Sequence, residues 1–138
     1  MDQRLSFVTL AVPDLEAARR FYLDGLGWEA ALDVPGEVGM IKVADRVVLS
    51  LWSEAGFEAE VGPIRRGDGA IPLTLAHNVA TTEEADAVLV AAREAGAADV
   101  RLGVARDWGG YSGYFTDPGG FCWEVAVNPG PIGQEVLP

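Results

Sequence analysis

Apolar and polar positions alternate through residues 5–12, LSFVTLAV, as expected for a strand with two different faces. The two faces separate as follows: Val8, Leu10 and Val12 on one, and Phe7, Thr9 and Ala11 on the other. Pro13 ends this strand, Asp14 can cap a helix, and Gly27 can end that helix. The next alternating runs predict strands at 28–34, 39–43 and 47–52.

The same order of elements returns in the second half of the chain. Residues 73–79 predict a strand, and Thr81 and Glu84 have the spacing of a capping box that begins a helix. Gly96 can end this helix, and three further strands are predicted at 100–104, 112–116 and 121–127. We therefore expect an α+β fold of two βαβββ modules.

We expect the two modules to form a single domain that covers residues 1–138. It comprises a first module at about 5–53, a linker or surface loop at about 54–71, a second module at about 72–129, and a C-terminal tail, 130–138. Each module is too small to bury a sheet face alone. We therefore expect two mostly antiparallel sheets that pack or curve around a shared cup.

Composition narrows the class of protein. The chain has 138 residues and a formal net charge of −11, which disfavours nucleic acid as a partner because phosphates would be repelled. No stretch approaches the about 18 apolar residues that a membrane helix needs, and no signal peptide is recognised. Cys122 is the only cysteine, so no intrachain disulfide can form, and we expect a cytoplasmic protein.

Three segments together resemble the vicinal oxygen chelate superfamily, the glyoxalase, bleomycin-resistance and dioxygenase group. The segments are VTLAVPDLEAARRFYLDGLGW, LTLAHNV and GYFTDPGGFCWEVAVNP. The most specific motif is Asp117-Pro118 and Gly120 followed by Trp123-Glu124-Val125. The resemblance implies paired βαβββ modules that form a cupped sheet, and it implies a homodimer.

Metal-dependent members of that superfamily hold a divalent ion inside the cup, and the resemblance assigns each ligand position in this chain. The first and second ligands fall at Phe7 and Thr74, the last-strand carboxylate falls at Glu124, and the equivalent place in the fourth strand is near Ser50. Phenylalanine cannot coordinate a metal, and a catalytic site normally keeps about three protein ligands. We therefore expect no metal and no cofactor.

His77 lies three residues after Thr74, which puts it on the opposite face unless a bulge intervenes.

Strand alternation predicts which side chains face the cup. Trp123 and Val125 suit the helix side, so Glu124 faces the other way, inside an otherwise apolar strand where a charge is costly to bury unpaired. Arg46 and Arg106 are candidate partners for it. The expected ligand-binding residues are Phe7, Thr9, Ser50, Trp52, Thr74, Trp108, Tyr111 and Tyr114.

Three functions are compatible with this lining. The first is a metal-free protein that binds a small aromatic or cationic molecule. The second is a lyase, isomerase or dioxygenase that holds a metal through non-standard ligands. The third is a metal-free enzyme in which Glu124 acts as general base. Each competes with ordinary packing of the aromatic residues and with Glu124 as an internal carboxylate that serves no function.

Overall fold

The computed structural model describes residues 1, 3–64, 67, 69 and 71–138. The chain divides into two compact units, Met1–Asp68 and Gly69–Pro138, each described here by itself. Their boundary falls within the expected linker, about 54–71, of which residues 65, 66, 68 and 70 lie outside the described residues.

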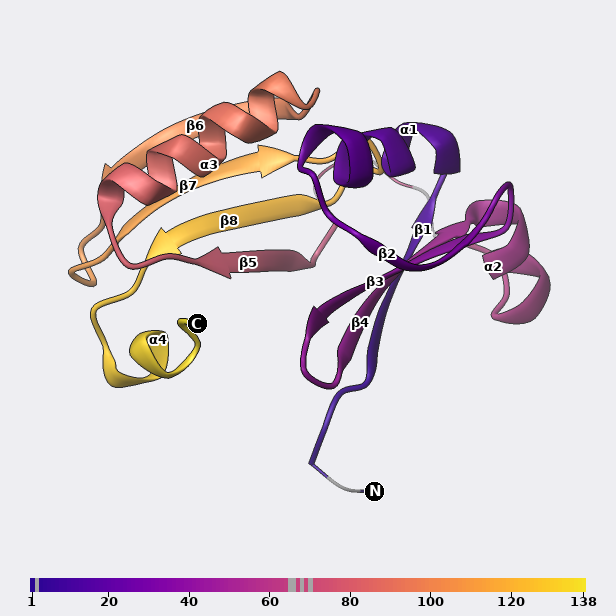
Figure 1. Ribbon diagram of the computed structural model, residues 1–138, viewed down its shortest axis with the longest axis horizontal. Helices are drawn as coiled ribbons and strands as arrows, with labels where there is room; N and C mark the ends of the chain where they lie inside the picture. Colours follow the sequence, from indigo (N-terminus) through magenta and orange to yellow (C-terminus); the bar gives the residue numbers. More distant parts are fainter. Residues whose placement is uncertain (2, 65–66, 68, 70) are drawn as a thin grey trace. The chain divides into compact units, whose positions relative to one another are not determined.

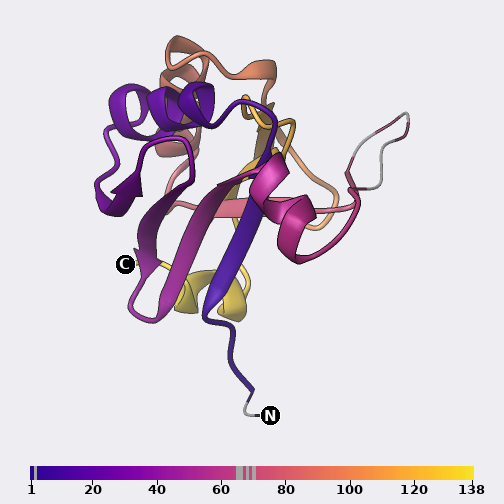
Figure 2. The same cartoon turned by 90° about the vertical axis from the view of Figure 1, so that its right-hand side faces the viewer.

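The first unit is a four-stranded sheet with a helix that connects its first two strands. Its strand order is β1-β4-β3-β2, with β1 parallel to β4 and the other neighbours antiparallel (Figure 2). The elements in chain order are β1 (Phe7–Val12), α1 (Leu15–Arg19), the π-helical segment η1 (Arg20–Gly25), β2 (Ala30–Val34), β3 (Val38–Ala44), β4 (Val47–Ser53) and α2 (Glu54–Glu60).

One face of this first sheet is buried, as the alternation in β1 predicts. Leu10 and Val12 are each 1% exposed, whereas Phe7 on the other face is 50% exposed. Leu10 lies beside the buried Leu51 of β4, and α1 also contacts β4. Asp14 accepts a 2.9 Å hydrogen bond from the backbone N–H of Ala17, which caps α1 as expected.

The second unit repeats this arrangement. Its strand order is β5-β8-β7-β6, with β5 parallel to β8 and the other neighbours antiparallel, and α3 covers one face of the sheet (Figure 1). The elements are β5 (Thr74–Asn78), α3 (Thr82–Glu94), β6 (Ala98–Ala105), β7 (Tyr111–Thr116), β8 (Cys122–Val127) and α4 (Pro131–Glu135). The capping box of Thr81 and Glu84 is confirmed, with both reciprocal hydrogen bonds formed.

Two segments differ from the sequence expectation. The expected linker begins with α2, because the Ser53 side chain accepts a 3.2 Å hydrogen bond from the N–H of Gly56 and starts a helix there. The expected tail contains α4, which begins with Pro131 at its first turn. Both helices are short, so neither offers the sustained apolar stripe by which a helix is recognised in a sequence.

The predicted fold class is confirmed. The order βαβββ occurs twice, and in each four-stranded sheet one parallel pair accompanies two antiparallel pairs. Among the described residues, no helix has the length and apolar character that crossing a bilayer requires.

Candidate functional site

Glu124 lies in a row of four residues that crosses the second sheet. The register pairs Arg101 of β6 with Tyr114 of β7, Tyr114 with Glu124 of β8, and Glu124 with Ala76 of β5. Residues paired across strands project on the same face of a sheet, so all four share one face. We call it the Glu124 face; α3 covers the opposite one, where Leu89 lies close to Gly113.

The parity predicted for the last strand is therefore observed. Val125 is 0% exposed and Trp123 is 7% exposed, on the side that α3 covers, whereas Glu124 is only partly buried. The ring of Trp123 stacks on that of Phe115, with centroids 6.0 Å apart, which accounts for the aromatic residues on the covered side.

The Glu124 carboxylate is held by a tyrosine. The hydroxyl of Tyr114 donates a 2.8 Å hydrogen bond to Oε1 of Glu124. Among the described residues, none donates a hydrogen bond to the second oxygen, Oε2. Arg106, a candidate partner from the sequence, bonds to Ser112 instead, and Arg46 lies 3.5 Å from a carboxylate oxygen of Asp45. Glu124 thus keeps an oxygen available to a ligand.

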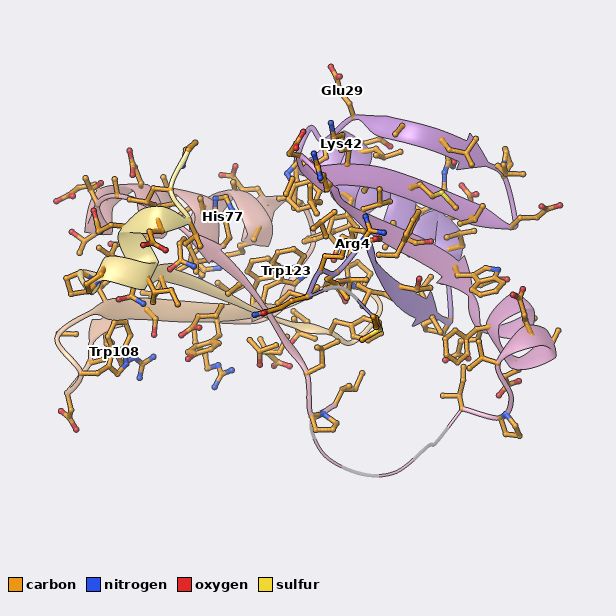
Figure 3. The ribbon with its side chains drawn as sticks, turned by 90° about the horizontal axis from the view of Figure 1, so that it is seen from below. Arg4, Glu29, Lys42, His77, Trp108 and Trp123 are labelled. Atoms are coloured by element: carbon orange, nitrogen blue, oxygen red, sulfur yellow. The ribbon has the colours of Figure 1, made fainter. Side chains whose placement is uncertain are left out.

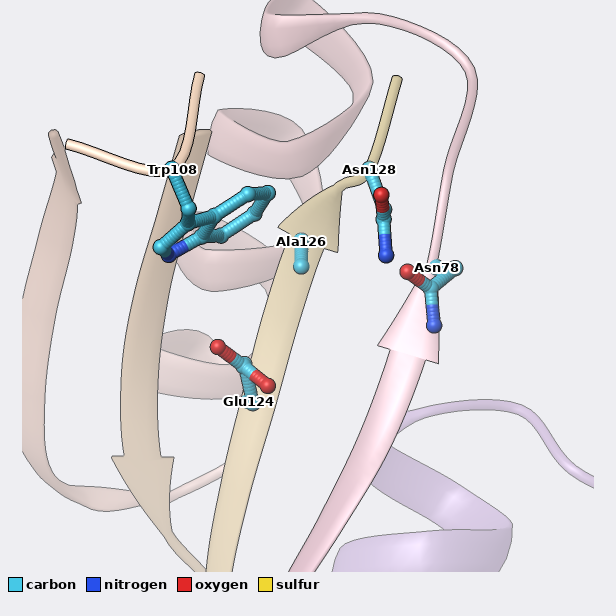
Figure 4. A pocket seen from close by; sticks show the side chains of 5 residues that line it. All are labelled: Asn78, Trp108, Glu124, Ala126 and Asn128. Atoms are coloured by element: carbon cyan, nitrogen blue, oxygen red, sulfur yellow. The ribbon is translucent and has the colours of Figure 1, made fainter. Parts of the chain in front are cut away.

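A hollow of about 310 Å³ opens beside Glu124. It is lined by Asn78, Trp108, Glu124, Ala126 and Asn128, which Figure 4 shows around the end of β8. An indole, two amides and one carboxylate supply an apolar plane, hydrogen-bond donors and acceptors, and a negative charge. This lining offers a small molecule an aromatic plane beside several hydrogen-bonding groups.

Trp108 reaches the hollow because of a tight loop between β6 and β7 (Figure 3). The backbone N–H of Arg106 bonds to the Gly110 carbonyl at 2.8 Å, and Gly109 adopts a φ of +88°, which favours glycine. A Cβ on Gly110 would lie 1.7 Å from the Trp108 ring. The two glycines therefore allow the indole, 53% exposed, to lie across the loop backbone.

Two arginines lie over the Tyr114 ring: Arg106, expected only as a partner of Glu124, and Arg101, which the sequence did not indicate. The guanidinium carbon of Arg101 is 4.8 Å from the ring centroid, and that of Arg106 is 5.6 Å from it. Both distances are within the range of cation–π attraction. Arg106 also donates hydrogen bonds to the Ser112 hydroxyl at 2.9 Å and to the Ser112 carbonyl at 3.0 Å.

The structure places Tyr111 outside this hollow. Tyr111 pairs with Val127 and shares its face, so it lies opposite Glu124, and its hydroxyl donates a 2.8 Å hydrogen bond to Oδ1 of Asp86 in α3. That bond is the main cause that raises the pKa of Tyr111 above its ordinary value. His77 pairs with Val125, so it too lies on the face opposite Glu124, as its spacing from Thr74 predicts (Figure 3).

The expected ligand-binding residues of the first module gather on one face of the first sheet. The register pairs Thr9 with Ser50, and Ala11 with Trp52, so these residues share a face with Phe7. Ser50 is buried at 4% exposure, and the ring of Trp52 packs edge-on against Phe57 of α2 at 6.1 Å. They form a candidate surface of the first unit.

Comparison with known proteins identifies the family. The model of the Glyoxalase/Bleomycin resistance protein/Dioxygenase superfamily matches residues 4–125, which is most of the chain. The chain belongs to this superfamily. Among curated proteins, none matches the sequence.

Solved structures agree with this membership. A glyoxalase-related enzyme from Fulvimarina pelagi is 33% identical, with 93% of this chain and 90% of that chain covered and a TM-score of 0.82. A lactoylglutathione lyase from Agrobacterium tumefaciens is 25% identical, covers 92% of this chain and 95% of its own, and has a TM-score of 0.69. A superfamily protein from Nocardioides, 21% identical with a TM-score of 0.76 and coverage of 94% and 87%, shows the fold alone.

The side chains on the Glu124 face do not fit the divalent metal that some members of the superfamily hold. Thr74 pairs with Cys122, and Ala76 pairs with Glu124, so the neighbour of the carboxylate on β5 has no donor atom. Within the described residues, no group of three His, Cys, Asp or Glu side chains is arranged to hold a metal. On the first sheet, Phe7 pairs with Val48, and neither side chain can be a ligand.

Proposed function

We propose that this superfamily member binds a small aromatic or cationic molecule at the Glu124 face, through a degenerate site that uses no metal. The observation that carries the proposal is the oriented carboxylate of Glu124 beside a hollow of about 310 Å³. The carboxylate attracts a cation, and the Trp108 indole offers a plane for an aromatic ring.

The proposed site uses side chains of the second unit. Tyr114 orients the carboxylate, Asn78 and Asn128 offer amide groups, and Trp108 lies beside them. Thr74 lies on the same face, two residues before Ala76 on β5, at the edge of the site. We further propose a cytoplasmic homodimer, which superfamily membership and the single cysteine support.

Titration of Glu124→Gln with benzylamine, an aromatic cation, tests the proposal. The substitution keeps the shape of the side chain and removes its charge, so binding should weaken by about 1–3 kcal/mol, the scale of a charged hydrogen bond. Chemical shifts in ¹⁵N spectra measure the affinity. Glu94→Gln, an exposed residue at the end of α3, removes the same charge elsewhere and should leave binding unchanged. Normal folding with unchanged affinity in Glu124→Gln would refute the proposal.

A second candidate function is enzymatic, with Glu124 as general base. Two of the similar structures are described as enzymes, the glyoxalase-related enzyme and the lactoylglutathione lyase. In addition, Oε2 of Glu124 accepts no hydrogen bond from a described residue, which leaves it positioned to accept a proton. Loss of carbon-bound protons of dihydroxyacetone in exchange for deuterium from D₂O, followed by NMR, tests this candidate. Exchange that is faster than in buffer alone, and that is lost in Glu124→Gln, would support the enzymatic function. Exchange no faster than in buffer alone would argue against it.

A further inference from the structure

Two arginines on the Glu124 face carry charges that no carboxylate of the described chain neutralises. Arg101 and Arg106 both lie over the Tyr114 ring, and neither forms an ion pair among the described residues. This is unexpected in a chain with 21 acidic and 10 basic residues. Glu124 is close in the row, yet it accepts from the neutral Tyr114 hydroxyl.

The Arg101 side chain is held in place while its hydrogen-bond donors remain available. Its guanidinium stacks 4.8 Å from the Tyr114 centroid, and its one hydrogen bond to a described residue is a long contact of 4.0 Å from Nη2 to Sγ of Cys122. A guanidinium presents five N–H donors in a planar fork that matches a carboxylate. Stacking restricts the fork in advance, so less side-chain entropy is lost when an anion binds.

We propose that Arg101, assisted by Arg106, binds the carboxylate of a small-molecule ligand whose opposite end is a cation or hydrogen-bond donor that meets Glu124. This inference rests on the proposed function and names its ligand class, an amphoteric molecule. The register supports it, since Arg101 and Glu124 lie on strands separated only by β7, and Tyr114 of β7 contacts both, its ring the Arg101 guanidinium and its hydroxyl the Glu124 carboxylate. The two charged groups are therefore separated by about the length of that tyrosine side chain, which suits the two ends of a small ligand.

The overall negative charge of the chain does not oppose this assignment. Charges separated by more than a Debye length, about 8 Å at physiological ionic strength, are largely screened. A bound carboxylate therefore interacts mainly with the two nearby guanidinium groups, which outnumber the single carboxylate of Glu124 in the row. Carboxylate–guanidinium hydrogen bonds are among the stronger polar contacts because both partners carry charge.

Three related probes test the inference: 4-(aminomethyl)benzoate, which carries both groups, benzylamine, which carries only the cation, and benzoate, which carries only the anion. Affinities are measured from ¹⁵N chemical shifts of the full chain. We expect 4-(aminomethyl)benzoate to bind most tightly, and Arg101→Gln to weaken it about tenfold without weakening benzylamine, whose cation the arginine does not attract. Arg93→Gln, an exposed arginine of α3, is the matched control and should change neither affinity.

The outcomes separate this inference from the proposed function. If benzylamine binds as tightly as 4-(aminomethyl)benzoate, or if Arg101→Gln binds both probes as the native chain does, the carboxylate site is refuted and the proposed function remains. If none of the three probes shows saturable binding, both are refuted. A thermal melt of Arg101→Gln that matches the native chain confirms that any loss is not due to unfolding.

Discussion

The hydroxyl of Tyr114 donates a 2.8 Å hydrogen bond to Oε1 of Glu124 from the neighbouring strand of the same sheet. A neutral donor therefore orients the carboxylate and does not cancel its charge. The Tyr114 ring lies under the guanidinium groups of Arg101 and Arg106, so one tyrosine joins the positive and negative parts of the face. Tyr114 is thus a positioning residue for both ends of the proposed ligand.

Tyr114→Phe should weaken benzylamine binding by about threefold, because the lost hydroxyl only orients Glu124 and the charge that attracts the cation stays in place. The loss should be smaller than in Glu124→Gln, where the charge itself is removed. Tyr111→Phe is the matched control, since Tyr111 lies on the α3 side of the same strand. Equal losses in the two tyrosine variants would contradict this role.

An aromatic ligand should quench tryptophan fluorescence through Trp108 or Trp52. Trp108 lines the hollow, and Trp52 belongs to the candidate face of the first sheet. With 4-nitrobenzylamine as the quenching probe, we expect Trp108→Phe to lose most of the ligand-dependent signal and part of the affinity. If Trp52→Phe and Trp108→Phe both bind the probe unchanged, the assigned aromatic residues do not contact it.

The Tyr111–Asp86 hydrogen bond should make stability depend on pH at the alkaline end. The folded-state pKa of Tyr111 is raised above the ordinary 10.0, mainly by the hydrogen bond to Asp86 and secondly by desolvation. A raised pKa means that this contribution is fully present below pH 10 and is lost as pH rises through the folded-state pKa. Urea unfolding should show Tyr111→Phe less stable than the native chain at pH 8, with the difference shrinking above pH 10. If the difference in unfolding free energy between Tyr111→Phe and the native chain did not change with pH, the Tyr111–Asp86 bond would be excluded as the source of that difference.

Elemental analysis of protein purified without chelators should find no stoichiometric transition metal. The physical reason is the donor set, in which Phe7 and Thr74 occupy positions where metal-dependent relatives are expected to place ligands. Protein dialysed against Zn²⁺ and then against buffer is the stringent form of the measurement. One tightly held metal ion per chain, lost in Glu124→Gln, would support the alternative of a lyase, isomerase or dioxygenase with non-standard ligands.

Light scattering at micromolar concentration should give twice the mass of the chain. Superfamily membership supports a homodimer, and several large apolar side chains are exposed in the single chain, among them Leu5 at 61%, Phe7 at 50% and Leu32 at 47%. Burial of such residues at an interface would remove them from water. A monomeric mass across the micromolar range would contradict the homodimer.

The sequence by itself determined the faces of the regular strands. The alternation that buries Leu10 and Val12 and turns Glu124 away from Trp123 follows from the two-residue period of a strand, which is a local property of the backbone. The same period separates Tyr111 from Tyr114, which are three positions apart. The sequence therefore contained the signal that Tyr111 lies on the α3 side, although Tyr111 was expected among the ligand-binding residues.

Only the tertiary structure decided which charges accompany Glu124. The register of β6 shifts between Ala98 and Arg101 and again between Arg101 and Val104, so alternation along that strand does not reveal where Arg101 points. Arg106 reaches Ser112 from the loop after β6, and Gly110 leaves room for Trp108 there. The row from Arg101 through Tyr114 to Glu124 depends on which strands lie side by side and in what register. Long-range hydrogen bonding between strands sets both, and a local pattern of polar and apolar residues does not encode either.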